Sequence, residues 1–270
     1  MKWSGSKDSQ AKNIISFFPK KIESYREPFL GGGSVFLQLL ESDIEVNNYY
    51  LSDVNKELIG IYQLIMDEPD LLITTYNKHY KEFNSGDIQH RKDYFNEVRK
   101  IFNETKNPED FYWIMRTTTN GMPRYNRKLE FNNSCHFSRS GMNPTDVEKI
   151  IRKYCQLFLS KHIHFFYNSY ETISLYSESK DDLIYMDPPY ENTKGMYFSN
   201  FNNIEFIEYV NKLDCNWVLS YDGKVNDVEV IHVAPNYVRK EYLVSGNSSF
   251  RRVIGNSNDS IISESLYLNF

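Results

Sequence analysis

The chain has 270 residues and a formal net charge of −5, which argues against indiscriminate binding to nucleic acid but says little about local patches. No apolar run approaches the roughly 18 residues that a membrane-spanning helix needs, so no membrane location is expected. The three cysteines, Cys135, Cys155 and Cys215, lack the spacing of metal ligands. They predict a reducing, cytoplasmic setting without disulfides and without a bound metal.

The first part of the chain alternates predicted helices and strands. In chain order these are a helix over 8–18, a strand near 25–28, a helix over 34–41, a strand ending at Asp53 and a helix over 55–69. Apolar residues recur at helical spacing in the helical segments. The β-α-β-α order favours a parallel sheet that is flanked by helices.

Residues 61–144 break this pattern and are interpreted as an inserted subdomain of helices and loops. A helical spacing is present in "KDYFNEVRKIF", whereas 116–143 is rich in Thr, Asn, Gly, Arg and Ser. Thr145 and Glu148 then have the spacing of a capping box and predict a new helix start. Strands follow at "IHFFY", "DLIYMD", "NWVLSY", "EVIHVA" and "ESLYLNF", so the insert splits one α/β domain into 1–60 and 145–270.

The segment "EPFLGGGSVF" places Gly31, Gly32 and Gly33 between a predicted strand and a helix. Glycines there permit positive φ and let a ligand approach the backbone. A dinucleotide fingerprint would need a third glycine where Phe36 stands, which weakens a nicotinamide oxidoreductase reading. Asp53, at the end of the second strand, is placed to accept hydrogen bonds from ribose hydroxyls, although it could also cap the following helix. Together these features favour a cofactor with an adenosine moiety.

The segment "LIYMDPPYENT" reads as a buried strand that stops at a carboxylate. The Asp187 carboxylate and the Pro188 carbonyl are two acceptors for the hydrogens of one planar amine, and Pro188 and Pro189 fix the backbone before the substrate arrives. The ring of Tyr190 can stack on a base, which must be flipped out of a duplex to reach it. The alternative is a rigid turn in which Asp187 caps and Tyr190 packs.

The order of these motifs resembles that of the Dam-type DNA adenine-N6 methyltransferases over nearly the whole chain. The matching segments are "KWSGSK" at 2–7, "REPFLGGGSVF", "LSDVNKELI", "NGMPRYNRKLEFN" at 120–132, "FYNSY" at 166–170, Asp187–Tyr190, "VLSYDG" and "SFRRVIG" at 249–255. The resemblance implies a Rossmann-like, S-adenosylmethionine-dependent methyltransferase fold with a mostly parallel sheet and helices on both faces. It implies a catalytic domain of 1–60 and 145–270 with an inserted target-recognition domain of 61–144.

The resemblance also implies roles for individual residues. The cofactor positions are Trp3, Lys7, Phe29, Gly31, Gly33, Asp53 and Asp187. The flipped adenine would be held by Asp187, Pro188, Pro189 and Tyr190. The residues alone leave two alternatives open, with Trp3 as a core anchor and Lys7 as a solvated surface charge.

The DNA-binding residues are expected in and after the insert. Arg124 is predicted to read a base, because arginine can bond a guanine edge with two hydrogen bonds. Residues expected beside it are Asn120, Met122, Tyr125 and Asn126, of which a methionine or tyrosine could wedge into the stack. Residues expected on phosphates are Arg116, Arg127, Lys128 and Arg139, with Arg251 and Arg252 on the other side. A solvated face is the alternative for each of these cations.

The predicted activity is methyl transfer from S-adenosylmethionine, without a metal, to N6 of a flipped-out adenine in double-stranded DNA. The setting would be a bacterial or phage-infected cell, and no obligatory protein partner is evident. GATC is the leading target, although "FNNSCHF" at 131–137 stands where many relatives have "FNVPFG". The alternatives are a methyltransferase on another planar amine, such as RNA adenine, cytosine N4 or a glutamine side chain, and a catalytically silent DNA-binding regulator.

Overall fold

The fold is described from a computed structural model of the chain. The structure describes residues 2–3, 5–173, 179–189, 201–225, 228–229, 234–244 and 262–270. Three of the predicted site residues, Tyr190, Arg251 and Arg252, lie outside these ranges. Their predicted roles therefore stay predictions.

In the described part of the chain the strands form one mixed sheet, in the order β3-β2-β1-β4-β5-β8-β7, with β6 paired to β5. The neighbouring strands β3, β2, β1, β4 and β5 pair in parallel. The pairs β5–β6, β5–β8 and β7–β8 are antiparallel. This confirms the predicted α/β class. The strands are β1 (Lys21–Glu27), β2 (Glu45–Asp53), β3 (His162–Tyr167), β4 (Leu183–Met186), β5 (Asn216–Val225), β6 (Val228–Glu229), β7 (Arg239–Val244) and β8 (Ile262–Leu268).

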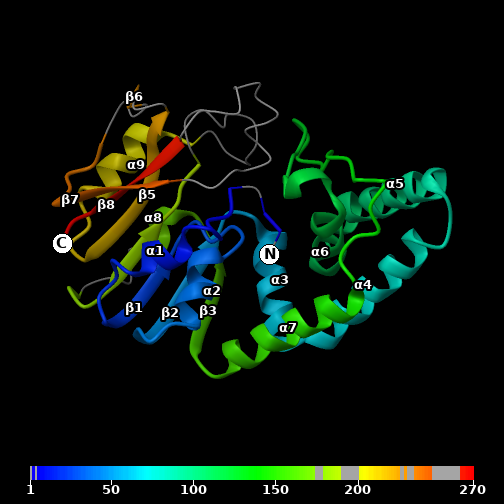
Figure 1. The fold of residues 1–270 in the computed structure, drawn as a ribbon, viewed down its shortest axis with the longest axis horizontal. Helices are drawn as coiled ribbons and strands as arrows, with labels where there is room; N and C mark the ends of the chain where they lie inside the picture. The colour runs from blue at the N-terminus through cyan, green and yellow to red at the C-terminus, as the bar shows by residue number, and fades with distance from the viewer. Residues whose placement is uncertain are drawn as a thin grey trace.

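The helices lie in two groups. Helices α1, α2 and α9 lie with the sheet at one end of the molecule, α4, α5 and α6 lie at the other, and α3 and α7 run between them (Figure 1). The helical elements are α1 (Ala11–Ile15), α2 (Ser34–Leu40), α3 (Lys56–Asp67), α4 (Pro69–Phe83), α5 (Ile88–Thr105), α6 (Pro108–Thr117), the 3-10 turn η1 (Thr119–Gly121), α7 (Pro144–Leu159), α8 (Tyr170–Ile173) and α9 (Asn203–Val210).

Strand β4 is buried on both faces. Leu183 and Tyr185 belong to the apolar core on the side of α1 and α2, whereas Ile184 and Met186 belong to the core formed with α9. Side chains alternate between the two faces of a strand, so helices must cover both sides of this sheet. The central position of β4 places the residue that follows it, Asp187, at the middle of the carboxyl edge.

Two local expectations are wrong. The first helix covers Ala11–Ile15 rather than 8–18, because the residues that follow it close into i to i+3 turns before Pro19. Helix α7 is capped by Asn143 and not by Thr145: Asn143 Oδ1 accepts from Thr145 N at 2.9 Å, and Pro144 occupies the first helical position. Asparagine is among the strongest caps, and proline is favoured immediately after a cap.

Helices α3–α7 lie between β2 and β3 along the chain, yet β2 and β3 are neighbours in the sheet. The chain therefore leaves the sheet and returns to it at adjacent strands. The helical group packs around Trp113, which is fully buried and in contact with the rings of Phe83, Phe95 and His79. Trp113, Phe83 and Phe95 continue the apolar core of β1, β2 and α2 without a break. The limits 61 and 144 stay a prediction, and α3 runs across the first of them.

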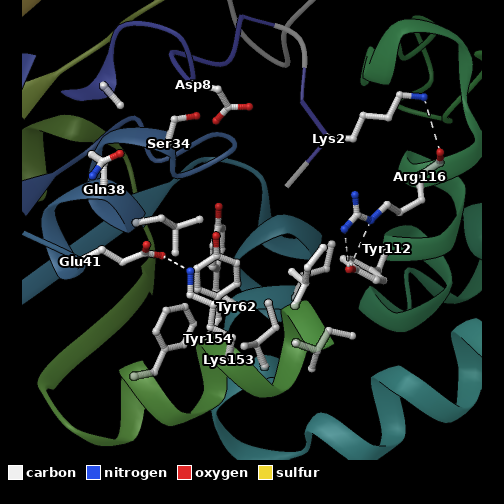
Figure 2. Close-up of a pocket in the computed structure, with 17 residues that line it drawn as sticks. Lys2, Asp8, Ser34, Gln38, Glu41, Tyr62, Tyr112, Arg116, Lys153 and Tyr154 are labelled. Atoms are coloured by element: carbon white, nitrogen blue, oxygen red, sulfur yellow. Dashed lines mark hydrogen bonds and ion pairs between the residues drawn. The ribbon is translucent and has the colours of Figure 1, made fainter. Parts of the chain in front are cut away.

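A cavity of about 570 Å³ lies between α1 and α2 on one side and α3, α6 and α7 on the other (Figure 2). Some of the polar side chains that line it form ion pairs or hydrogen bonds with one another. Lys153 Nζ lies 2.6 Å from Glu41 Oε1, and the Arg116 guanidinium donates to Tyr112 Oη. None of the predicted cofactor residues lines the cavity, although Ser34 and Tyr62 on its wall adjoin Gly31–Gly33.

Candidate active site

The turn after β1 depends on glycine. Gly31 and Gly33 have φ of +48° and +69°, in the left-handed region that favours glycine. Tyr62 lies behind the turn and donates from its hydroxyl to the Gly31 carbonyl at 3.0 Å. A Cβ on Gly33 would lie 2.5 Å from that hydroxyl oxygen. The backbone conformation and the lack of space therefore both require the glycine.

Asp53 ties the end of β2 to this turn. One carboxylate oxygen accepts from Gly31 N at 2.9 Å, and the other accepts from Asn55 N at 2.9 Å. The cap of α3 is Asn55, whose side chain accepts from Leu58 N, so the alternative of Asp53 as that cap is wrong. Burial raises the pKa of Asp53 to about 6, although the backbone donors of Gly31 and Asn55 act in the opposite direction.

Lys7 is held against the carboxylate that follows β4. Its Nζ lies 2.9 Å from Asp187 Oδ1 and 3.4 Å from Glu264 Oε2, and only 7% of Lys7 is exposed. The alternative of a solvated surface charge is therefore wrong. Burial alone would lower the pKa of Lys7, but the two carboxylates outweigh it and raise that pKa well above its ordinary value. Pro188 is buried and Pro189 is half-buried beside this ion pair.

Glu27, the last residue of β1, is a buried acid that sequence reasoning missed. Its exposure is 2%, and its Oε2 accepts from Tyr25 Oη at 2.6 Å. Burial raises the pKa of Glu27 to about 8, and the charges of Asp187 and Asp53 act in the same direction against the Tyr25 hydrogen bond. The available signal was an acid at the carboxyl end of a strand directly before the glycine turn.

Aromatic rings border the glycine turn. Trp3 packs edge-on against Phe111, and a Cβ on Gly31 would lie 3.3 Å from Trp3 Nε1. Phe29 stacks on Tyr170 with 5.5 Å between ring centroids. Tyr170 belongs to the segment "FYNSY", and its contact with Phe29 was not predicted. The structure thus gathers the predicted cofactor residues at the carboxyl ends of β1, β2 and β4.

Residues 131–137 shape the loop that carries Arg124. Asn132 Oδ1 accepts from Arg124 Nε at 2.9 Å. The Asn133 amide donates to the carbonyls of Thr119 and Met122 at 3.2 and 3.0 Å. Arg124 itself is exposed. Asn132 and Asn133 therefore support this loop from within 131–137.

The other predicted DNA contacts have different environments. Asn126 is used within the loop, since its side chain accepts from Lys128 N and Glu130 N. Tyr125 points inward, where its hydroxyl accepts from Asn55 Nδ2 at 3.4 Å, and burial raises its pKa well above the ordinary value. Asn120 and Met122 are half-buried, as is Arg116, which donates to Tyr112. Exposed cations of the set are Arg127, Lys128 and Arg139.

The described residues contain no group of three or more His, Cys, Asp or Glu side chains placed to hold a metal ion. None of the helices in the same ranges is long and apolar enough to cross a membrane.

A mixed α/β sheet with a glycine turn after β1 and Asp-Pro-Pro after β4 defines a Rossmann-like methyltransferase. The family described as D12 class N6 adenine-specific DNA methyltransferase matches residues 3–250. The chain belongs to this family, which confirms the resemblance drawn from its motifs, and by class it is an adenine-specific DNA methyltransferase.

Relatives come from restriction-modification systems, bacterial genomes and a phage. The type II methyltransferase M.MjaIII of Methanocaldococcus jannaschii is 29% identical over 219 residues, which cover 76% of this chain and 74% of the relative. A DNA adenine methylase of Haemophilus influenzae is 31% identical over 70% of this chain and 63% of the relative. The DNA N-6-adenine-methyltransferase of Escherichia phage P1 is 26% identical over 76% of this chain, but the match spans only 26% of that larger protein.

Proposed function

We propose that the protein transfers a methyl group from S-adenosylmethionine to N6 of a flipped-out adenine in double-stranded DNA, with GATC as the first target to test. The observation that carries this proposal is the position of Asp187. It lies after the central strand, is held by Lys7 at 2.9 Å, and is followed by two prolines. Residues 61–144 would select the sequence, with Arg124 exposed to meet a base edge.

The residues at the carboxyl edge suit the proposed cofactor. A Cβ at Gly31 or Gly33 would press against Trp3 or Tyr62, so the two glycines let these side chains pack directly against the turn. Asp53 would accept from ribose hydroxyls, and Trp3, Lys7 and Phe29 would complete the pocket. Bound there, S-adenosylmethionine would supply an electrophilic methyl group.

The chemistry required of the protein is polarisation of an amine. The exocyclic lone pair of adenine is delocalised into the ring and is a poor nucleophile. The Asp187 carboxylate and the Pro188 carbonyl would each accept one amine hydrogen and draw the lone pair out of conjugation. Because proline fixes φ, the second acceptor is in place before the base arrives, so little reorganisation is needed in the transition state.

The direct test is incubation of unmethylated genomic DNA with the protein and labelled S-adenosylmethionine, followed by long-read mapping of modified bases. We expect label in DNA and N6-methyladenine in one short sequence. Label in RNA or in protein, with none in DNA, would overturn the proposal. A modified motif other than GATC would correct only the target.

Asp187→Ala should reduce the methylation rate by at least about a thousandfold, because loss of a preorganised acceptor costs several kcal/mol of transition-state stabilisation. Asp181→Ala is the matched control, since Asp181 is exposed ahead of the same strand. The rates of both variants are measured on duplex DNA at saturating substrate. A rate within about tenfold of wild type for Asp187→Ala would show that the carboxylate does not polarise the amine.

A further inference from the structure

Lys7 is shared by two carboxylates that come from opposite sides of β5. Asp187 follows β4, and Glu264 lies on β8, while β5 separates these two strands in the sheet. The side chains of Asp187 and Glu264 are 19% and 18% exposed, so water screens this cluster only in part. One ammonium between two carboxylates leaves the cluster with a formal charge of −1.

Among the described residues, no hydrogen bond holds the Oε2 atom of Glu264 in this place. Its Oε2 is buried and has no hydrogen-bond partner among the described residues, and the contact with Lys7 at 3.4 Å is an ion pair. The register between β5 and β8 shifts between Tyr221 and Lys224, opposite Ser265 and Ser263, which flank Glu264. Irregular pairing of this kind is frequent beside active sites, where it re-aims a side chain. A buried carboxylate oxygen whose described partner is an ammonium at 3.4 Å is poorly compensated, so this arrangement calls for a function.

We propose that Glu264 is a positioning residue for methyl transfer, which acts through Lys7 to keep the Asp187 carboxylate oriented and strongly hydrogen-bond accepting. This inference rests on the proposed function. If Asp187 were the sole anion on Lys7, the ammonium would neutralise it and weaken it as an acceptor for the amine hydrogens. Because Glu264 also pairs with the Lys7 ammonium, that ammonium does not fully neutralise Asp187. The cluster therefore keeps a negative charge that would face the substrate.

That negative charge has a use in the transition state. The attacking amine would become positively charged as its bond to the methyl group forms and the sulfur–methyl bond of the donor breaks, until the amine loses one proton to solvent. A preorganised anion stabilises such developing charge most effectively where water is partly excluded. Glu27, whose charge would act on Asp187, has a pKa raised to about 8 by burial and is mostly protonated at neutral pH. Tyr185, also close to Asp187, is buried with its pKa raised by burial.

The test is Glu264→Gln, compared with Glu264→Asp and with Glu241→Gln. Glu241 lies on the neighbouring strand β7 and pairs with Arg239 rather than with Lys7, so it controls for the same chemical change on the same sheet. On duplex DNA we expect kcat of Glu264→Gln to fall about tenfold or more, with KM for DNA within about twofold of wild type. The acid limb of the kcat profile should move to lower pH, because a negative charge beside Asp187 has been removed.

Glu264→Asp keeps the charge and should restore both the position of the acid limb and part of kcat, a result that a purely structural role would not produce. Glu241→Gln should match wild type. If Glu264→Gln keeps kcat within about twofold and the acid limb does not move, the inference is wrong, while loss of activity in Asp187→Ala still supports the proposed function. If Glu264→Gln fails to fold, Glu264→Asp decides alone: a displaced acid limb in that variant overturns the inference. Wild-type protein without transfer to DNA overturns the proposed function and this role together.

Discussion

At the scale of single residues, Glu27 makes the fold sensitive to pH. Its pKa is raised from an ordinary 4.5 to about 8 by burial, with the charges of Asp187 and Asp53 adding to the effect. Between these pH values the folded protein holds a proton that the unfolded chain has lost. The stabilisation from Glu27 is therefore complete below about pH 4.5 and is lost as the pH rises towards 8.

Glu27→Gln should remove this dependence, because glutamine stays neutral and can still accept from Tyr25. Between pH 5 and pH 8 the free energy of unfolding of wild type should fall by on the order of a few kcal/mol relative to this variant. Urea unfolding at several pH values measures the difference. Glu23→Gln is the control, since Glu23 is an exposed residue of the same strand. Parallel stability curves for wild type and Glu27→Gln would contradict the raised pKa.

At the scale of elements, the turn between β1 and α2 should tolerate no side chain at Gly33 without a loss of stability. Gly33→Ala adds a Cβ 2.5 Å from the Tyr62 hydroxyl oxygen and forces alanine into φ of +69°. Gly141→Ala is a matched control, because Gly141 has φ of +86° but an added Cβ would meet its nearest atoms at 3.6 Å. The control therefore carries the backbone strain without the clash.

We expect Gly141→Ala to lose about 1 kcal/mol of stability and Gly33→Ala to lose about 1–3 kcal/mol more, together with affinity for S-adenosylmethionine. Chemical unfolding and calorimetric titration measure the two losses. Adding Tyr62→Phe to Gly33→Ala should recover part of both, because it removes the closest atom. Equal losses of stability for Gly33→Ala and Gly141→Ala would contradict this expectation, because they would mean that Tyr62 moves aside without a loss of stability.

The same scale shows why some elements could be predicted and others could not. Helix α2 and strand β2 have clear apolar spacing and lie close to their predicted limits. Strand β7 was missed, because "RKEYLV" begins with three charged residues and pairs along one edge only. Helix α9 was missed because its acids and apolar residues follow an asparagine-rich stretch that reads as a loop. Glu264 could not be predicted as a site residue, because its partner Lys7 lies near the opposite end of the chain and only the fold brings the two together.

At the scale of the whole molecule, the first residues connect residues 118–121 of the insert to the glycine turn. Lys2 Nζ donates to the Thr118 carbonyl at 2.6 Å, and a Cβ on Gly121 would lie 2.9 Å from Lys2 Cγ. The next residue, Trp3, lies against Gly31. A ligand at the glycine turn that orders residues 2–3 should therefore also reduce the motion of the residues near Thr118 and Gly121.

We expect S-adenosylmethionine to slow amide hydrogen exchange at 118–125 as well as at 29–33, because both segments contact residues 2–3. Exchange mass spectrometry with and without the cofactor measures this. The amides of α5, which lie far along the helical group, serve as the internal control. The protection should vanish in Asp53→Ala, which loses the predicted ribose contact. Protection confined to 29–33 would contradict the coupling.

The sheet order also has a consequence for synthesis. Tyr25 on β1 pairs with Leu183 on β4, and the helices of the insert are made between them. A ribosome therefore releases the glycine turn and the recognition loop long before the strand that carries Asp187 emerges. Contacts this distant in sequence form late in folding. We expect unfinished chains to expose the predicted DNA-binding residues before they contain the Asp187 segment that the proposed methyl transfer needs.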